Sequence, residues 1–378
     1  MNVKEKDTFY GALQKRGVSR RDFLKFCTVM AASLGLSSSG AMTIAEALES
    51  RPRMPVIWRH FQECTCCTES FIRTSHPIVS EIIMSMISLD YDETLMVAAG
   101  ERAEAMARKT MEEHKGNYIL AVEGAIPMAD GGIYCCVGGH SALELLKEEA
   151  QHAKAIIAWG SCAVNGCVQA AKPNPTGAVA VQDIIKNKPI INVPGCPPIA
   201  EVMAGVITHV LTFERLPELD GEGRPKAFYG HRIHDKCNRR AYFDAGMFVE
   251  SFDDEGAKQG WCLYKLGCKG PNAYNNCSNI GFNGGVSYPI KSGHPCIACS
   301  EKGFWDYTGG QSIYSHLSDV PGLKIGKNVD QFGAIVVGGA IAGAAAHATV
   351  SAVTKKMHES KNETTTPSKN KEDESIGG

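Results

Sequence analysis

The sequence has almost no excess of charge of either sign. Its 378 residues include 39 Lys and Arg against 41 Asp and Glu, which gives a formal net charge of -2. Proteins that bind nucleic acid neutralise phosphates with a surplus of basic residues. Nucleic acid is therefore excluded as a partner.

Apolar periodicity is missing from a long segment in the second half of the chain. After Leu216–Lys226 (LPELDGEGRPK), about a hundred residues are rich in Gly, Asn, Pro and Cys, and they alternate little between apolar and polar. Such a segment cannot build a hydrophobic core of its own. We expect an irregular domain over residues 221–325 that something other than apolar packing must organise.

The N-terminus has the order of an export signal. The basic run Ser19–Lys25 (SRRDFLK) is followed by an uncharged stretch from Phe26 to Ala45 and then by Ala45-Glu46-Ala47. This order predicts a twin-arginine signal peptide over residues 1–47, with cleavage after Ala47. The alternative is a basic amphipathic helix. If the signal is removed, the body of the protein lies on the periplasmic side of the inner membrane.

A second uncharged run, Phe332–Val353, lies near the C-terminus. As a helix, its 22 residues would span about 33 Å, enough to cross a bilayer, although a buried soluble helix is the alternative. Lys355 and Lys356 follow it, and the positive-inside rule predicts a cytoplasmic C-terminus. We expect a single transmembrane helix over residues 331–354.

Two features belong to this C-terminal region. His347 is an uncommon residue within a membrane helix, so it is a candidate contact to a membrane partner, and hydrogen bonding to a neighbouring helix is equally compatible with it. Residues 355–378 are polar and poor in apolar groups, and we expect this cytoplasmic tail to be disordered.

Residues 48–220 alternate short apolar runs with helical patterns, which predicts an α/β fold with a parallel sheet. The expected strands are Pro55–His60, Thr94–Ala99, Asn117–Val122, Lys154–Trp159 and Pro189–Val193. The expected helices are Ile78–Leu89, Arg102–His114, Ala142–His152 and Ile199–Thr212.

In a parallel sheet of this kind, ligands bind beyond the carboxyl ends of the strands. Cys64 follows the first expected strand, and Glu123 follows the third. Cys162 and Cys196 follow the fourth and the fifth. These positions should converge on one rim of the sheet, called the crevice below, which is the predicted binding site.

The chain holds 15 cysteines, and fourteen remain once Cys27 leaves with the signal peptide. Most of them fall into three sets by position. The crevice set is Cys64, Cys66, Cys67, Cys162, Cys167 and Cys196; the second set is His234, Cys237, Cys262 and Cys268; the third set is Cys277, Cys296 and Cys299. Cys135 and Cys136 are left over, and we expect both to be small buried thiols.

Disulfides are one alternative for these thiols, because an exported protein meets an oxidising periplasm. Zinc held by four thiolates, or by three thiolates and a His, is another. The C-x-x-C spacing of Cys64 with Cys67, and the number of soft thiolates, favour iron–sulfur clusters. The H-x-x-C spacing of His234 and Cys237 indicates a His ligand, against the alternative of a surface-loop histidine.

Several motifs now point to one family. They are ECTCCTES (Glu63–Ser70), WGSCAVNGC (Trp159–Cys167), VPGCPP (Val193–Pro198), HDKC (His234–Cys237) and CLYKLGCKGP (Cys262–Pro271). With the leader and the C-terminal run, they resemble the small subunit of membrane-bound nickel–iron hydrogenases over nearly the whole chain. The resemblance implies a flavodoxin-like domain over residues 48–220, followed by the iron–sulfur domain.

The resemblance also implies ligands and partners. Cys64, Cys67, Cys162 and Cys196 would hold a proximal cluster, the third set a medial [3Fe–4S] cluster, and the second set a distal [4Fe–4S] cluster. Nothing in the chain looks like a nickel site. Hydrogen would be split in a separate NiFe large subunit, as a heterodimer or a dimer of heterodimers, and electrons would pass through this chain to a membrane cytochrome b and quinone.

Cys66 and Cys167 are additional to that ligand set. Most of the family has a glycine between the cysteines of the first motif, so the extra thiols resemble the oxygen-tolerant subgroup, in which six cysteines hold a [4Fe–3S] proximal cluster in place of [4Fe–4S]. Our hypothesis is that such a cluster releases two electrons in a narrow potential range, so that oxygen is fully reduced. Two inert buried thiols are the alternative.

Glu63 and Glu123 lie at the predicted crevice. Each is a candidate for supporting the proximal cluster or for proton transfer, and each could equally cap a helix or bind a backbone amide.

Two other functions share parts of the cysteine pattern. A quinone-reductase-type subunit would lack the two later clusters, and a non-catalytic hydrogen sensor would need neither export nor a membrane helix.

Overall fold

The computed structural model describes residues 8–15, 17–33, 36–50, 52–75, 77–306, 314 and 329–363. Contacts divide the chain into two units, residues 1–316 and 317–378, and each is described by itself.

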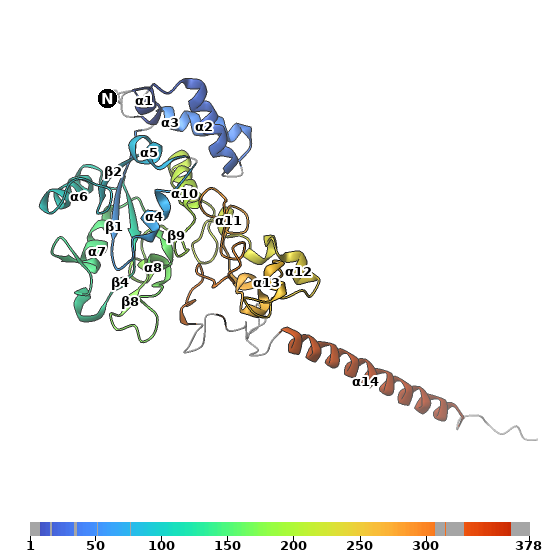
Figure 1. Ribbon diagram of the computed structural model, residues 1–378. Coiled ribbons are helices and arrows are strands. Elements are labelled where there is room, and N and C mark those ends of the chain that lie inside the picture. The colour runs from blue at the N-terminus through green and yellow to red at the C-terminus, as the bar shows by residue number, and fades with distance from the viewer. Residues whose placement is uncertain are drawn as a thin grey trace, which may run out of the picture. The chain divides into compact units, whose positions relative to one another are not determined.

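The centre of the first unit is a five-stranded parallel sheet (Figure 1). Its strands are β1 (Met54–His60), β2 (Ile87–Asp92), β3 (Ile119–Glu123), β7 (Ala155–Trp159) and β9 (Ile190–Val193). Their order in the sheet is β2-β1-β3-β7-β9, and all four pairings are parallel. This is the flavodoxin-like strand order. Successive strands are added on one side of β1 up to β2 and on its other side from β3 onward, so the topological switch point lies between β1 and β3.

Helices cover both faces of the sheet, so strand residues alternate between two cores (Figure 1). The helices are α4 (Cys66–Phe71), α6 (Glu101–Glu113), α7 (Ala142–His152), α8 (Gly160–Asn165), α9 (Val181–Ile184) and α10 (Ala200–Phe213). Ile57 and Leu120 share a core with α6 and α7. Trp58 and Ala121, one residue further along each strand, share the other core with α10. Burial on both faces explains why these strands are continuous apolar runs.

Four of the five expected strands are confirmed to within two residues, and the second is wrong. Thr94–Ala99 is not a strand, and Val97 within it is fully exposed. The second strand is instead Ile87–Asp92, which pairs with the outer edge of β1. The helix expected over Ile78–Leu89 is also wrong in extent, because only α5 (Val79–Glu81) and a π-helical turn, η1 (Ile82–Met86), form before β2 begins. An apolar run of this length fits either a helix or a strand, and pairing with β1 makes residues 87–92 a strand.

Residues 214–306, all of which the structure describes, contain no strand longer than an isolated bridge. Their helices are short: α11 (Lys226–Tyr229), η3 (Ile233–Lys236), α12 (Arg240–Asp244), α13 (Glu255–Lys258), η4 (Tyr264–Leu266) and η5 (Gly270–Asn272). Phe228, Tyr229 and Ile290 belong to the same core as α10. The region therefore packs on the sheet domain and has no separate core.

Smaller elements complete the first unit. The short strands β4 (Ile126–Pro127) and β8 (Ala178–Val179) pair with each other, as do β5 (Cys136–Val137) and β6 (His140–Ser141), and η2 (Ala129–Gly132) lies between β4 and β5. Residues expected to leave as a signal peptide form α1 (Phe9–Lys15), α2 (Arg20–Ser33) and α3 (Ser38–Ser50). These helices pack beside η1 and α10, and Cys27 is fully buried among them.

The described part of the second unit is the helix α14 (Val329–Glu363). Its window Ile335–Lys356 is long and apolar enough to cross a membrane, by length and composition only, and it buries nothing. The helix continues nine residues into the segment expected to be disordered, since residues 355–363 are helical. A run of residues with good helix propensity extends an existing helix at little cost. Residues 364–378 lie outside the described part of the chain.

Candidate metal centre

The carboxyl ends of the strands bring the crevice thiols together. Cys64 follows β1, Cys162 lies in α8 directly after β7, and Cys196 follows β9. Burial first, and then the charges of Glu123, Cys64 and Cys196, hold the pKa of Cys67 well above its usual range. The pKa of Cys64 is raised to about 11, first by burial, and Cys66 and Cys196 add to the shift. Thiols from separate strands therefore interact at this rim.

Cys167 connects the remaining members of the crevice set. Its side chain hydrogen-bonds with both Cys162 and Cys196, and the contact with Cys162 is the main reason that its pKa rises to about 12. The two added thiols differ in exposure: Cys66 is exposed, whereas Cys167 is buried. The structure thus brings all six crevice cysteines into one interacting group.

Local backbone geometry fixes the thiols of the first motif. Thr65 adopts a left-handed conformation with φ 62°, which turns the chain between Cys64 and α4. On the facing helix, Gly160 has φ +78°, and a Cβ there would lie only 2.3 Å from the Sγ of Cys67. Only glycine leaves room for this thiol.

The third set lies beside the crevice set. Burial raises the pKa of Cys299 to about 11, although a hydrogen bond from the backbone of Cys196 opposes the shift. Burial also raises the pKa of Cys296, and the charges of Cys268, Cys299 and Cys277 add to it. Cys196 therefore links the crevice set to the third set.

The second set lies beyond the third. The backbone N–H of Cys296 donates to the Sγ of Cys268 over 3.4 Å, so these two sets touch. Burial raises the pKa of Cys262 to about 11, and nearby Cys268 and Cys237 contribute. The backbone nitrogen of His234 and the Sγ of Cys268 both lie within 4 Å of a Cβ placed on Gly270, so the backbone of His234 passes near this set. The imidazole packs edge-on against Phe243, with ring centres 4.6 Å apart.

The contacts give the three sets a linear order. Cys196 and Cys299 join the crevice set to the third set, and Cys296 and Cys268 join the third to the second. Cysteine spacing did not give this order, because the second set precedes the third along the chain; the family resemblance had implied it.

The donors fit iron–sulfur clusters better than the two alternatives. All 15 cysteines lie in the described residues and all are free, so no thiols are paired as disulfides there. A structural zinc site gathers four donors on one ion, at Zn–S distances of about 2.3 Å. Among the described residues, the group of three or more donors whose ligand atoms all lie within 4.8 Å of one another is His60, Glu63 and Glu123, which includes no thiol. Larger groups of soft thiolates suit a core of several iron atoms.

Glu123 binds the start of the thiol-bearing helix. Its carboxylate accepts from the backbone N–H groups of Cys67 at 2.9 Å and Thr68 at 3.1 Å, and from the Thr68 hydroxyl at 2.8 Å. Of the two roles left open for Glu123, the structure therefore contains the backbone-binding one. Burial raises the pKa of this carboxyl, although His60 and Thr68 oppose the shift.

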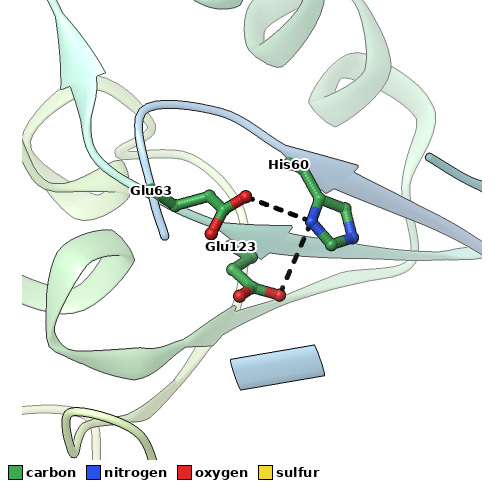
Figure 2. Close-up of side chains that lie close together, drawn as sticks. All are labelled: His60, Glu63 and Glu123. Atoms are coloured by element: carbon green, nitrogen blue, oxygen red, sulfur yellow. Dashed lines mark hydrogen bonds and ion pairs between the residues drawn. The ribbon is translucent and has the colours of Figure 1, made fainter. Parts of the chain in front are cut away.

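His60 is a site residue that the sequence interpretation missed. Figure 2 shows the carboxylates of Glu63 and Glu123 both facing its Nδ1, at 3.4 Å and 3.8 Å. Burial lowers the pKa of His60, but the neighbouring carboxylates of Asp92 and Glu63, with further carboxylates nearby, raise it to about 10. The signal was available, because His60 ends the first strand and the strand-end rule that selected the cysteines applies to it equally.

Three residues remain: the two cysteines outside the three thiol sets, and His347. Cys135 is half-buried, but Cys136 is exposed, so the expectation of two buried thiols is wrong for Cys136. The cause is the narrow hairpin β5–β6, which presents Cys136 to solvent. His347 lies on α14, in the second unit.

A parallel α/β sheet with thiols at its strand ends, continued by a Cys-rich irregular region, defines the class of iron–sulfur proteins built on a flavodoxin-like domain. Two family models match the chain. The NADH ubiquinone oxidoreductase 20 Kd subunit matches residues 64–210, and the C-terminal region of the NiFe/NiFeSe hydrogenase small subunit matches residues 229–310.

Relatives match over nearly the full length. The uptake hydrogenase small subunit of Azotobacter vinelandii is 58% identical over 347 residues, which cover 92% of this chain and 96% of that protein. The hydrogenase-1 small chain of Escherichia coli (strain K12) is 51% identical over 364 residues, 96% of this chain and 97% of that one. A [NiFeSe]-hydrogenase structure from Dm. baculatum has a TM-score of 0.65 at 36% identity and covers 71% of this chain and 100% of its own. The chain therefore belongs to the uptake hydrogenase small-subunit family.

Proposed function

We propose that this chain is the electron-transferring small subunit of a periplasm-facing NiFe hydrogenase. It would take electrons from hydrogen oxidation in a NiFe large subunit and deliver them to a membrane cytochrome b and quinone. Membership of the uptake hydrogenase small-subunit family supports the reaction. The observation that carries the electron-transfer role is the linear contact order of the three thiol sets.

The proposed ligands are the three sets defined above. Cys64, Cys66, Cys67, Cys162, Cys167 and Cys196 would hold the proximal cluster, Cys277, Cys296 and Cys299 a medial [3Fe–4S] cluster, and His234, Cys237, Cys262 and Cys268 a distal [4Fe–4S] cluster. When bound, such clusters accept and release single electrons.

The protein's own residues contribute spacing and a dry environment. Cys67, Cys277 and Cys296 are each at least 92% buried, so water is largely excluded from their thiols. Burial raises the pKa of all three thiols, and a bound metal would supply positive charge that favours their thiolate forms. Backbone amides then donate to sulfur, as Ala298 does to Cys296 over 3.3 Å, and such donors tune a cluster's potential.

Export and anchoring form the second part of the proposal. Residues 1–47 would act as a twin-arginine signal, and α14 would cross the membrane once with its C-terminus in the cytoplasm. The helix meets the length and composition required of a membrane span. His347 would face the membrane partner, and the exposed thiols Cys64, Cys66 and Cys196 would face the large subunit.

The test is spectroscopic and uses the intact membrane complex. Electron paramagnetic resonance during stepwise oxidation should reveal three clusters, and Cys299→Ser should remove the medial signal alone. Cys136→Ser is the matched control, because this exposed thiol lies outside the three sets, and it should change nothing. A complex isolated without oxygen that proves colourless and free of iron would refute the proposal.

A further inference from the structure

Three neighbouring strands end in one buried polar group. His60 is the last residue of β1, Asp92 of β2 and Glu123 of β3, and these strands are adjacent in the sheet. The exposed fractions of their side chains are 7%, 0% and 1%. Because parallel strands end at the same edge, the three side chains meet on the floor of the crevice.

His60 is the only basic member of this group and contacts every acidic member. Its Nδ1 faces Glu63 at 3.4 Å and Glu123 at 3.8 Å (Figure 2). Its Nε2 faces Asp92 at 3.7 Å and the Thr68 hydroxyl at 3.4 Å. The imidazole, on β1, therefore holds together side chains that approach from β2, from β3, from the loop after β1 and from α4.

The two carboxylates that face Nδ1 of His60 reach the thiol-bearing loop at both ends. Glu123 accepts from the backbone N–H groups of Cys67 and Thr68, at the start of α4. Glu63 directly precedes Cys64 and accepts from the Thr65 hydroxyl at 3.1 Å. Thr65 lies in the left-handed turn between the two thiols, so each carboxylate touches a different end of the turn.

We propose that His60 is a positioning residue for the proximal cluster: it fixes Glu63 and Glu123, and through them the relative positions of Cys64 and Cys67. The proposal rests on the proposed function, because it assumes that these thiols bind iron.

Removing the imidazole would leave the group without its balancing partner. Glu63, Asp92 and Glu123 would then face one another in a buried site, and one oxygen each of Glu63 and Asp92 already has no hydrogen-bond partner. The nearest remaining base, Arg59, is engaged by Glu104 at 2.9 Å and Glu149 at 2.6 Å. Repulsion would therefore separate the carboxylates and move the loop that they hold.

The experiment compares His60→Ala and His60→Gln in the whole complex. His60→Ala should shift the midpoint potential and the paramagnetic line shape of the proximal cluster, while the medial and distal signals stay unchanged. His60→Gln keeps an N–H donor for one carboxylate, so it should shift the potential and the line shape of the proximal cluster less. The matched control is His114→Gln, because His114 caps the C-terminal end of α6, away from the carboxyl ends of the strands. This control should leave all three signals as in the unmodified protein.

A second variant covers the case in which His60→Ala fails to assemble. Thr68→Val removes only the hydroxyl between His60 and Glu123, and it should shift the proximal signal in the same direction by a smaller amount. An unchanged proximal potential in folded His60→Gln and Thr68→Val overturns the positioning role. Absence of iron from the unmodified complex would instead overturn the proposed function, so the two failures are distinguishable.

Discussion

Gly160→Ala tests whether the crevice is built around the Cys67 thiol. Gly160 has φ +78°, and the added methyl group would lie 2.3 Å from the Sγ of Cys67. A left-handed alanine costs about 1–2 kcal/mol, and overpacking a close-packed site costs about 1–3 kcal/mol more. The free energy of unfolding should therefore fall by about 2–5 kcal/mol in total, unless the thiol rotates away and leaves its place.

Gly116→Ala separates these two contributions. Gly116 has nearly the same φ, +79°, but nothing lies within 4 Å of its added Cβ. It should therefore carry only the backbone cost. At roughly 2 °C per kcal/mol for a large domain, the thermal midpoint of Gly160→Ala should lie about 2–6 °C below that of Gly116→Ala.

The assay pairs thermal unfolding of the purified complex with its paramagnetic spectrum. Gly160→Ala should lose or alter the proximal signal even if Cys67 rotates and the stability cost is small, whereas Gly116→Ala should keep it. Equal midpoints together with equal spectra for the two variants would refute the close packing of Cys67 against Gly160.

Three further predictions follow from other parts of the structure. Replacing both Cys66 and Cys167 by Gly should preserve hydrogen oxidation without air and reduce it under air; unchanged tolerance would remove the role proposed for the extra thiols. Burial raises the pKa of Glu149 to about 7, although the charge of Arg59 opposes the shift. This value exceeds the unfolded value of 4.5, so the free energy of unfolding falls as the pH rises from about 4.5 through 7. Glu149→Gln should flatten this fall in a pH series of thermal midpoints. The same slope of thermal midpoint against pH in the variant and the unmodified protein would contradict the prediction. A chain ending at residue 328 should fractionate as a soluble complex that still reduces an artificial acceptor, and continued membrane attachment would contradict the anchor.

Much of the sheet could be predicted because its inner strands carry their own signal. β3 and β7 are buried on both faces, so they are uninterrupted apolar runs that stand out from the neighbouring helices. β2 lies at the edge of the sheet and is only partly buried, so its sequence ISLDYD has no such run. Its position depends on pairing with β1, which a local pattern does not encode.

Cysteine spacing predicted which residues belong to the site, but it did not predict the contacts between the three thiol sets. Cysteine spacing and the strand-end rule assigned the thiols to three sets, but the contact between Cys196 and Cys299 joins residues far apart in the chain. His60 was missed for a different reason. A single histidine in an apolar strand resembles an ordinary core residue until Asp92 and Glu123 are known to end the neighbouring strands.

The sheet's topology also constrains how the protein is made. The donors of the second set span only residues 234–268. The crevice set is complete only after β9 has paired with β7, since Cys196 follows the last strand. Bringing together positions so distant in sequence carries a larger loop-closure entropy than closing a short segment. If these sets bind metal as proposed, a complete crevice site therefore requires a finished sheet, whereas the second set requires only the closure of a shorter loop.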